Sequence, residues 1–273
     1  MAIVTISRGS ASGGLLLAKG LAKKLGYDLI TREEIIRGGA SKFGVVEAKL
    51  EKAIVGPPVF SEEFKQDVQC YLTYYQEALC DRAQKDNLVY LGHAGHLLLR
   101  GIAHVLRIRL IAPSSYRIRT LVGREGMTEE QASAYIEQVD AQRRAWTLLL
   151  YGVDVLSPAL YDLTLSLEAM NIDSAVEIAA TAVNRPEFTA TIQSRKAIMD
   201  LLLESRVKAA LAADPASSLT SVDVKADSTS GTVILKGNLR ASSQIDAAAQ
   251  IARAVDGVMK VDESQLTCSE SQA

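Results

Sequence analysis

Residues 3–26 read IVTISRGSASGGLLLAKGLAKKLG, and this stretch decides the fold. The apolar run Ile3–Ile6 predicts a buried strand. Serines and glycines follow it, and leucines at four-residue spacing over 17–25 then predict an amphipathic helix that ends at Gly26. A strand, a glycine-rich turn and a helix in this order are typical of a phosphate-binding loop.

The loop lacks two groups that such loops normally carry. The standard pattern ends in Gly-Lys-Ser or Gly-Lys-Thr, where the lysine reaches the phosphates and the hydroxyl binds magnesium. Here Gly14 stands at the lysine position, Leu15 at the hydroxyl position, and Arg8 replaces the first glycine. The groups that still predict anion binding at the start of the helix are Ser10, Ser12, Gly13 and Gly14. A glycine-rich turn that binds no ligand is the alternative.

Arginines gather in the middle of the chain. Eight of the 17 arginines lie in 100–144, and no lysine occurs in 86–195. Guanidinium groups grip phosphate oxygens with paired hydrogen bonds, so this segment suits a phosphate clamp. Asp140 precedes Arg143 and Arg144 by three and four residues, a spacing that favours an ion pair on a helix surface. A solvent-facing role is the alternative, favoured for Arg107, Arg109 and Arg119.

Composition narrows the class of protein. The chain has 273 residues, is 48% hydrophobic and carries a formal charge of -2, so it can bury an ordinary core and has no basic field that would predict nucleic-acid binding. Its three cysteines have neither metal-ligand spacing nor an even count, which favours a reducing compartment. We find no leader-like segment and no apolar run long enough to span a membrane, and we expect a cytoplasmic protein.

Further strands and helices alternate along the first two thirds of the chain. Apolar runs predict strands at Leu88–Leu91, Leu106–Ala112 and Leu163–Leu167, separated by helical patterns. The fold class expected is therefore α/β, a parallel sheet flanked by helices. Helix starts are predicted at Thr31 with Glu34, Thr128 with Gln131, and Ser174 with Glu177, and a break at 56–58 precedes a helix from Ser61.

The composition changes after about residue 185. Alternating valines and leucines on either side of the turn at 227–231 predict a hairpin, with one helix before it and another over 243–255. A last strand is expected near Val258–Val261, and a frayed tail at 269–273. This region is predicted to form a separate small α+β module.

At this point the chain resembles the cytidylate kinase-like proteins, which are relatives of the nucleoside monophosphate kinases. The resemblance runs from residue 2 to about 183. Its motifs, in order, are Ile6-Ser7-Arg8, Ser12-Gly13-Gly14, Leu25-Gly26-Tyr27, Arg32-Glu33, Gly92-His93-Ala94, Ala112-Pro113, Tyr116-Arg117, Arg124-Glu125-Gly126, Val139-Asp140 with Arg143, Tyr151-Gly152 with Asp154, and Tyr161-Asp162-Leu163.

The resemblance implies a P-loop kinase-like domain over 1–185 with an arginine-bearing lid at about 114–146. Ser12, Gly13 and Gly14 would then cradle donor phosphates, and Arg8 would supply part of the missing lysine's charge. The lid residues implied to be catalytic are Arg117, Arg124 and Arg143, and further phosphate or nucleotide contacts are implied for Ser10, Arg32 and His93. The chain departs from the family pattern at Ala11, Thr31, His93 and Val155. Each departure removes a charge, a phosphate contact or a stacking surface.

Residues 195–267 are similar to BON domains. The run Gly231-Thr232-Val233-Ile234-Leu235-Lys236-Gly237, followed by Gly257-Val258, carries this resemblance. Such modules contact lipids or proteins and have no catalytic set. In this chain, contact with a protein partner or a ligand is the expectation.

Three functions remain open on these grounds. The first is a nucleoside monophosphate kinase for cytidylate that uses ATP and Mg²⁺, with a degenerate P-loop. The second is a non-catalytic sensor of a nucleotide or another phosphorylated small molecule, which signals through the BON-like module. The third is a structural adaptor in which the loop is vestigial. Loss of a preorganised charge donor typically costs about 10²–10³ in rate, which favours general phosphate binding over turnover.

Overall fold

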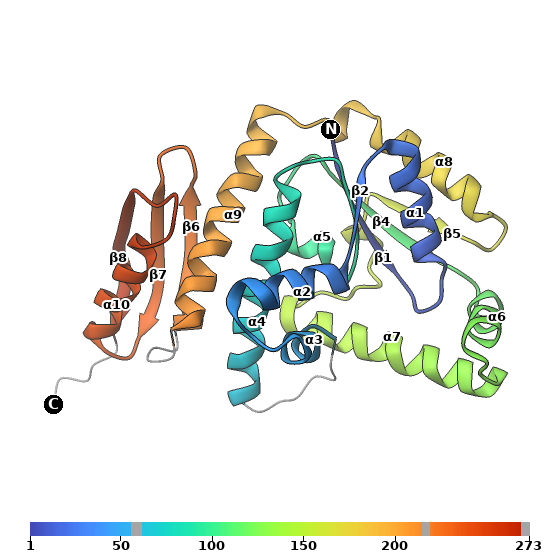
Figure 1. Cartoon of the computed structure of the whole chain (residues 1–273), viewed down its shortest axis with the longest axis horizontal. Coiled ribbons are helices and arrows are strands. Elements are labelled where there is room, and N and C mark those ends of the chain that lie inside the picture. Colours follow the sequence, from blue (N-terminus) through green and yellow to red (C-terminus); the bar gives the residue numbers. More distant parts are fainter. Residues whose placement is uncertain (56–61, 215–218, 269–273) are drawn as a thin grey trace. The chain divides into compact units, whose positions relative to one another are not determined.

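The computed structural model describes residues 1–55, 62–214 and 219–268 (Figure 1). These residues form two compact units. The first holds 1–34, 55 and 85–191, and the second holds 35–54, 62–84, 192–214 and 219–268. The predicted break at 56–58, the helix start at Ser61 and the tail at 269–273 lie outside the described residues. The predicted domain limits, 1–185 and 195–267, stay a prediction.

The first unit is built on a five-stranded parallel sheet. Its strands are β1 (Ile3–Arg8), β2 (Asp28–Thr31), β3 (Leu88–Leu91), β4 (Val105–Ile111) and β5 (Leu163–Ser166). Their order in space is β2-β3-β1-β4-β5, with every pairing parallel. The predicted α/β class is confirmed. The sequence patterns located every strand of this sheet except β2, whose sequence Asp28-Leu29-Ile30-Thr31 has only two apolar residues and so shows no apolar run.

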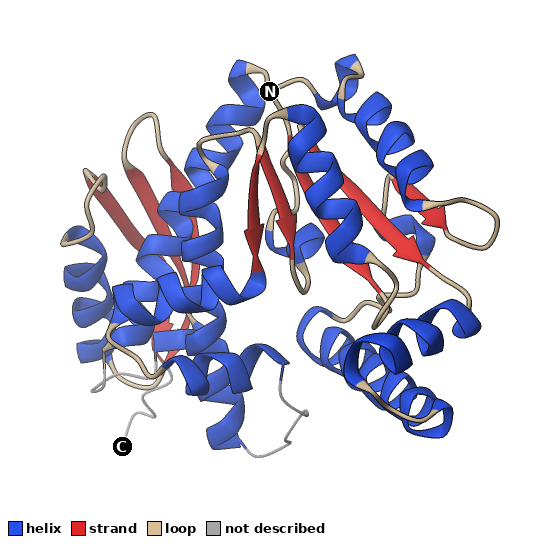
Figure 2. Ribbon diagram, turned by 45° about the vertical axis from the view of Figure 1, so that its right-hand side comes forward, coloured by secondary structure: helices blue, strands red, loops and turns tan. Residues whose placement is uncertain are grey.

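The central position of β1 creates the site. β1 lies between β3 and β4, because the chain passes from β1 to the edge strand β2, returns to β3 beside β1, and then crosses to β4 on the other side of β1. The loops after β1, β3 and β4 therefore meet at one edge of the sheet. Helix α1 (Gly14–Leu25) follows β1, α5 (Gly95–Leu98) follows β3, and α6 (Ser114–Glu125) and α7 (Glu129–Tyr151) follow β4. In Figure 2 the arrowheads of the central strands point toward the α6–α7 pair.

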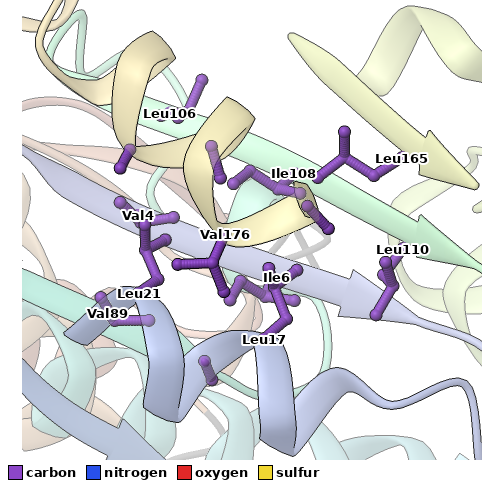
Figure 3. Packing of buried hydrophobic residues seen from close by; sticks show 14 of the residues in the cluster. Val4, Ile6, Leu17, Leu21, Val89, Leu106, Ile108, Leu110, Leu165 and Val176 are labelled. Atoms are coloured by element: carbon purple, nitrogen blue, oxygen red, sulfur yellow. The ribbon is translucent and has the colours of Figure 1, made fainter. Parts of the chain in front are cut away.

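Helix α1 packs against α8 (Ile172–Val183) over one face of this sheet (Figure 3). Leu17 and Leu21 are fully buried, as the four-residue spacing predicts. Gly20 lets the two helices approach closely, because a Cβ atom there would lie 2.7 Å from Cγ2 of Val176. Burial of this apolar stripe fixes the direction in which α1 presents its N-terminus.

Side-chain caps define several helix starts. Thr128 and Gln131 form the predicted capping box at the start of α7. Thr31 exchanges hydrogen bonds with Glu34 at the start of α2 (Arg32–Phe43), also as predicted. The predicted start at Ser174 is wrong, because Asn171 accepts from the Ser174 amide and α8 begins at Ile172. Asparagine is an equally good cap, and the pattern Ser-x-x-Glu pointed three residues too late.

The second unit joins helices from both halves of the sequence. It contains most of α2, together with α3 (Glu47–Val55), α4 (Glu62–Ala83) and α9 (Ile192–Ala213). Strands β6 (Asp223–Asp227), β7 (Thr232–Leu239) and β8 (Lys260–Cys268) form its sheet, and α10 (Ser242–Arg253) covers it. The predicted hairpin is β6–β7, which is antiparallel, and β8 pairs in parallel with β7. The last strand is longer than the predicted 258–261, because it continues through a polar stretch beside β7.

Helix α9 packs against α4 within this second unit. Glu77 of α4 is fully buried, and its carboxylate lies 2.6 Å from Lys42 Nζ and 3.7 Å from Arg206 Nε of α9. Ser205 of α9 lies 3.8 Å from Cys80 Sγ. The first helix of the C-terminal region therefore shares a polar core with helices of the N-terminal region.

The tyrosines of α4 belong to this packing. Tyr74 and Tyr75 are buried, and Tyr74 stacks on Phe43 at a centroid distance of 4.2 Å. Across the described segments, no helix combines the length and the apolar character that crossing a membrane requires.

Candidate functional site

The loop after β1 has the backbone shape of an anion cradle. Ala11 and Gly13 have positive φ values of 55° and 80°, and Gly13 is the residue that precedes α1. No described side chain caps α1 at that end. The turn thus directs backbone amides and the positive end of the helix dipole toward the same edge of the sheet. Gly13 and Gly14 have no side chains, so they allow a ligand to approach this backbone closely.

Two adjacent cavities open on the loop. The strand-side cavity is lined by Ser7, Arg8, Gly9, Ser12, Gly92, His93, Arg109, Ile111, Ala112, Arg117, Asp140, Arg143, Val155 and Leu156. The helix-side cavity is lined by residues 8–16, Leu91, Tyr116, Thr120, Leu121, Arg124, Tyr135 and Arg143. Arg8, Ser12 and Arg143 border both, so they stand where the two cavities meet.

Ser12 carries a buried polar atom that the described residues leave unsatisfied. Its side chain is 1% exposed, and within the described ranges no group hydrogen-bonds its hydroxyl oxygen. A buried hydroxyl without a partner costs about 1–3 kcal/mol. Ser12 borders both cavities, so this unpartnered hydroxyl lies beside the space that a ligand would fill.

Asp140 of α7 ties the lid helices to the loop. Its Oδ1 accepts from the Ser10 amide at 3.0 Å and from Ser10 Oγ at 2.7 Å, while its Oδ2 pairs with Arg117. Arg117 Nε also donates to the Ser10 carbonyl at 2.7 Å, and Arg143 Nη1 lies 3.4 Å from Ser10 Oγ. Burial alone would raise the pKa of Asp140, but these hydrogen bonds outweigh it and hold that pKa below its usual value.

The ion pair expected between Asp140 and Arg143 is present, but it is not the main contact of this carboxylate. Asp140 and Arg143 are 3.9 Å apart, but the carboxylate is bonded chiefly to Ser10 and Arg117. Arg144 turns away and pairs with Asp154 at 2.6 Å. Sequence spacing identifies neighbours on one helix, whereas contact with Ser10 depends on how α7 lies over the loop.

The lid arginines occupy different places. Arg117 and Arg143 point into the site, with side chains that are 14% and 21% exposed. Arg124 borders the helix-side cavity, yet its side chain is 64% exposed and pairs with the adjacent Glu125. The structure therefore brings two of the three predicted lid arginines to the loop and leaves Arg124 at the rim.

The solvent-facing role that the sequence favours for Arg109 is wrong. Its guanidinium borders the strand-side cavity, donates to the Val155 carbonyl at 3.1 Å and lies over the Tyr161 ring. Arg107, two residues earlier on β4, pairs with Asp162. The strand alternation could have shown that the two share a face, but not that one of them reaches a cavity.

Arg8, Arg32 and Arg143 raise the positive potential at the loop. Burial and the charges of Arg143 and Arg32 together lower the pKa of Arg8 to about 10. Arg8 Nη1 donates to the Gly92 carbonyl at 3.3 Å, and Arg32 pairs with Glu33. A buried guanidinium with two others near it favours a bound anion.

His93 is neutral in this environment. Burial, together with the charges of Arg143 and Arg8, lowers its pKa to about 3. Its ring meets Trp146 edge-on at 5.7 Å, and Nε2 lies 3.4 Å from Thr147 Oγ1. It borders the strand-side cavity, where it can offer a neutral hydrogen bond but not the charge of an arginine.

The donor set does not match a loop-bound magnesium ion. Leu15 stands at the hydroxyl position and is 44% exposed, and the described residues contain no group of three side chains that could hold a metal. Magnesium prefers oxygen ligands and keeps several of its waters. This chain's loop therefore supplies no side-chain ligand at the usual place.

Comparison with known proteins agrees with this geometry. The model of the cytidylate kinase-like family matches residues 3–169, and that of the BON domain matches 200–269. A cytidylate kinase of Methanoculleus marisnigri is 31% identical over 180 residues, covering 66% of this chain and 93% of the relative. One of Pyrobaculum arsenaticum is 26% identical over 196 residues, covering 72% and 97%.

A solved structure shares the fold. An uncharacterised protein from Eubacterium ventriosum superposes with a TM-score of 0.54 at 17% identity, covering 67% of this chain and 98% of that one. The five-stranded order, the glycine-rich loop after β1 and the family match over more than half of the chain lead to one assignment. This chain belongs to the cytidylate kinase-like family.

Proposed function

We propose that this protein binds the phosphates of a nucleotide at the loop after β1, and that phosphoryl transfer from ATP to cytidylate is its first candidate activity. One observation carries the proposal. Arg8, Arg117 and Arg143 line the same cavity as Ser12, whose buried hydroxyl has no partner among the described residues. Two curated relatives named cytidylate kinase support the choice of acceptor.

The chain's own groups define what the site can do. Backbone amides at Gly13 and Gly14 and the hydroxyl of Ser12 receive phosphate oxygens. Arg117 and Arg143 neutralise charge on the transferring group, and Asp140 holds Arg117 in position. Positioning and charge neutralisation make up nearly all of phosphoryl-transfer catalysis, so these residues cover most of its requirements. Mg²⁺ would be carried by the ATP phosphates and water.

A sensor is the second candidate, and the second unit favours it. Helix α9 of the BON-like region shares the buried Glu77 cluster with α2 and α4. A bound ligand that shifts α2 or α4 would therefore also shift α9, which belongs to the region that would contact a protein partner. We propose a nucleotide or another phosphorylated small molecule as this ligand, with no nucleic acid involved, in a cytoplasmic protein.

A coupled-enzyme assay separates the two candidates. Full-length protein is given ATP, Mg²⁺ and each nucleoside monophosphate in turn, and binding of the same ligands is measured by calorimetry. Turnover with cytidylate that falls about 10²-fold or more in Arg117→Ala supports the kinase. Saturable binding without product supports the sensor.

Arg119→Ala is the matched control, because Arg119 is exposed on the same helix as Arg117. It should change neither binding nor turnover. Absence of binding of every nucleotide tested would contradict both candidates and leave the structural adaptor.

A further inference from the structure

The side chain of Arg8 occupies the space beside Gly14, at the position where the standard loop carries its lysine. A Cβ atom built on Gly14 would lie 2.9 Å from both Cγ and Cδ of Arg8, and 3.3 Å from Nε. Real Cβ atoms essentially never approach other atoms this closely, so the two side chains exclude each other. Arg8 ends β1 and Gly14 begins α1, which puts them at the two ends of the same loop.

We propose that Arg8 performs the phosphate-neutralising role of the missing loop lysine, and that Gly14 is a glycine because the stem of Arg8 fills its side-chain space. The positive charge is thus delivered from the end of the strand instead of the start of the helix. This proposal rests on the proposed function, because it requires a phosphate ligand in the loop. The ligand class it implies is a polyphosphate chain, such as that of a nucleoside di- or triphosphate.

The contacts of Arg8 are consistent with this role. Its guanidinium borders both cavities, and it donates to a neutral acceptor, the Gly92 carbonyl. The nearby carboxylates are engaged elsewhere, Asp140 by Ser10 and Arg117, and Glu33 by Arg32. A guanidinium that keeps a carbonyl as its partner can still offer its other N–H groups to phosphate oxygens.

The surroundings also explain why this residue is an arginine. The charged and titratable groups around it are Arg143 of α7, Arg32 and Glu33 of α2, and Tyr90 of β3. Burial and the charges of Arg143 and Arg32 lower the pKa of Arg8 to about 10, while Tyr90 and Glu33 oppose this shift. The same burial and the same guanidinium charges would lower the pKa of a lysine at position 8 below its ordinary value of about 10.4. A lysine at position 8 would then lose charge at mildly alkaline pH, whereas arginine stays charged.

The first experiment tests the shared space without any ligand. Thermal unfolding is measured for Gly14→Ala, Arg8→Ala and the double variant. Gly14→Ala should lower the melting temperature by several degrees in the parent chain and by much less once Arg8 is alanine. Equal losses in the two backgrounds would overturn the claim that Arg8 fills the Gly14 space.

The second experiment tests the role, with inorganic pyrophosphate and ATP as probes in calorimetry. Arg8→Ala should weaken pyrophosphate binding about 10- to 100-fold, as expected for a charged hydrogen-bond donor. The variant Arg8→Ala/Gly14→Lys, which places a lysine at its standard position, should recover most of that loss. Arg119→Ala again serves as the control for a change of one surface charge.

A pH series adds a readout that a merely structural role would not move. Arg8→Lys should bind pyrophosphate like the parent protein at pH 6.5 and progressively less well toward pH 9. The parent should keep its affinity over that range, apart from the common ionisation of the probe. A parallel pH dependence in both proteins would count against a charge contribution from position 8.

Each outcome has one meaning. Loss of pyrophosphate binding in Arg8→Ala, with recovery in Arg8→Ala/Gly14→Lys, supports the proposal that Arg8 takes the role of the loop lysine. Two results would overturn the role of Arg8 and leave the proposed function standing. One is unchanged pyrophosphate binding in Arg8→Ala. The other is a loss of binding that a folded Arg8→Ala/Gly14→Lys variant does not recover. If the parent protein binds neither pyrophosphate nor ATP, the proposed function fails, and the role of Arg8 fails with it.

Discussion

At the scale of single residues, the site combines an unsatisfied hydroxyl with an internal carboxylate. Ser12 is buried without a partner among the described groups, while Ser10, two residues earlier, is held by Asp140. The protein itself thus fixes the loop at Ser10, whereas the hydroxyl of Ser12 is available to a ligand. These two features predict opposite responses to mutation.

Ser12→Ala should weaken ligand binding without destabilising the free protein. The substitution removes a buried hydroxyl that has no protein partner, so the free energy of unfolding should stay unchanged or rise by up to about 1 kcal/mol. Affinity for pyrophosphate should fall several-fold to about 10-fold. Urea unfolding and calorimetry on the same preparations check both, and a clear loss of stability would show that the hydroxyl is already satisfied.

Asp140→Asn should cost stability in a pH-dependent way. The pKa of Asp140 is lower in the folded protein than in the unfolded chain, so its contribution is fully present above about pH 4 and is lost as pH falls through the folded pKa. At pH 7 we expect a loss of about 1–3 kcal/mol, because Ser10 and Arg117 lose a charged partner.

The measurement for Asp140 is urea unfolding of both proteins at pH 7, 5 and 3. The gap between parent and Asp140→Asn should shrink at pH 3. A gap that stays constant over this range would mean that the pKa of Asp140 is the same in the folded and the unfolded chain.

At the scale of secondary-structure elements, the approach of α1 to α8 holds the loop in place. Gly20→Ala should destabilise the protein by about 1–2 kcal/mol, because the clash with Val176 exceeds the gain in helix propensity. The loss should be smaller in a Val176→Ala background. Chemical denaturation of the four proteins in this cycle gives the coupling.

Gly38→Ala on α2 is the matched control for that cycle. A Cβ atom at Gly38 meets nothing within 4 Å, and the position is exposed. Alanine there should stabilise the protein by about 0.5–1 kcal/mol. Destabilisation at both glycines would mean that close packing at Gly20 is not the cause.

At the scale of the whole molecule, the BON-like region and the helical section of the kinase-like region are not separate in their packing. Arg206 of α9 lies 3.7 Å from the carboxylate of Glu77, which is fully buried. It also lies 3.5 Å from the carboxylate of Asp81, which is partly exposed. Removing a partner from a buried ion pair is strongly destabilising. The C-terminal region therefore supports α4 as well as carrying its own sheet.

A chain that ends at Thr191 should show loss of amide-exchange protection over residues 68–83 of α4. The point variant Arg206→Gln should reduce protection at the same residues to a lesser extent. Lys196→Ala, which removes a surface pair with Asp200 and Asp227, is the control and should leave α4 unchanged. Full protection of α4 in the shortened chain would show that the two regions fold independently.

The sequence by itself determined the strand, loop and helix at 3–26, three further strands and the hairpin of the C-terminal region. Periodicity and glycine placement are local signals, and burial follows them directly. It also indicated Arg117 and Arg143, because the family motifs carry those positions.

Only the tertiary structure decided which of these groups meet. Sequence spacing could not show that Asp140 reaches Ser10, that Arg109 borders a cavity, or that Arg8 fills the space beside Gly14. Each of these contacts joins the end of one element to another element, and its existence depends on how packed helices and strands are oriented. Local propensity carries no information about that orientation, which long-range burial of apolar surface sets.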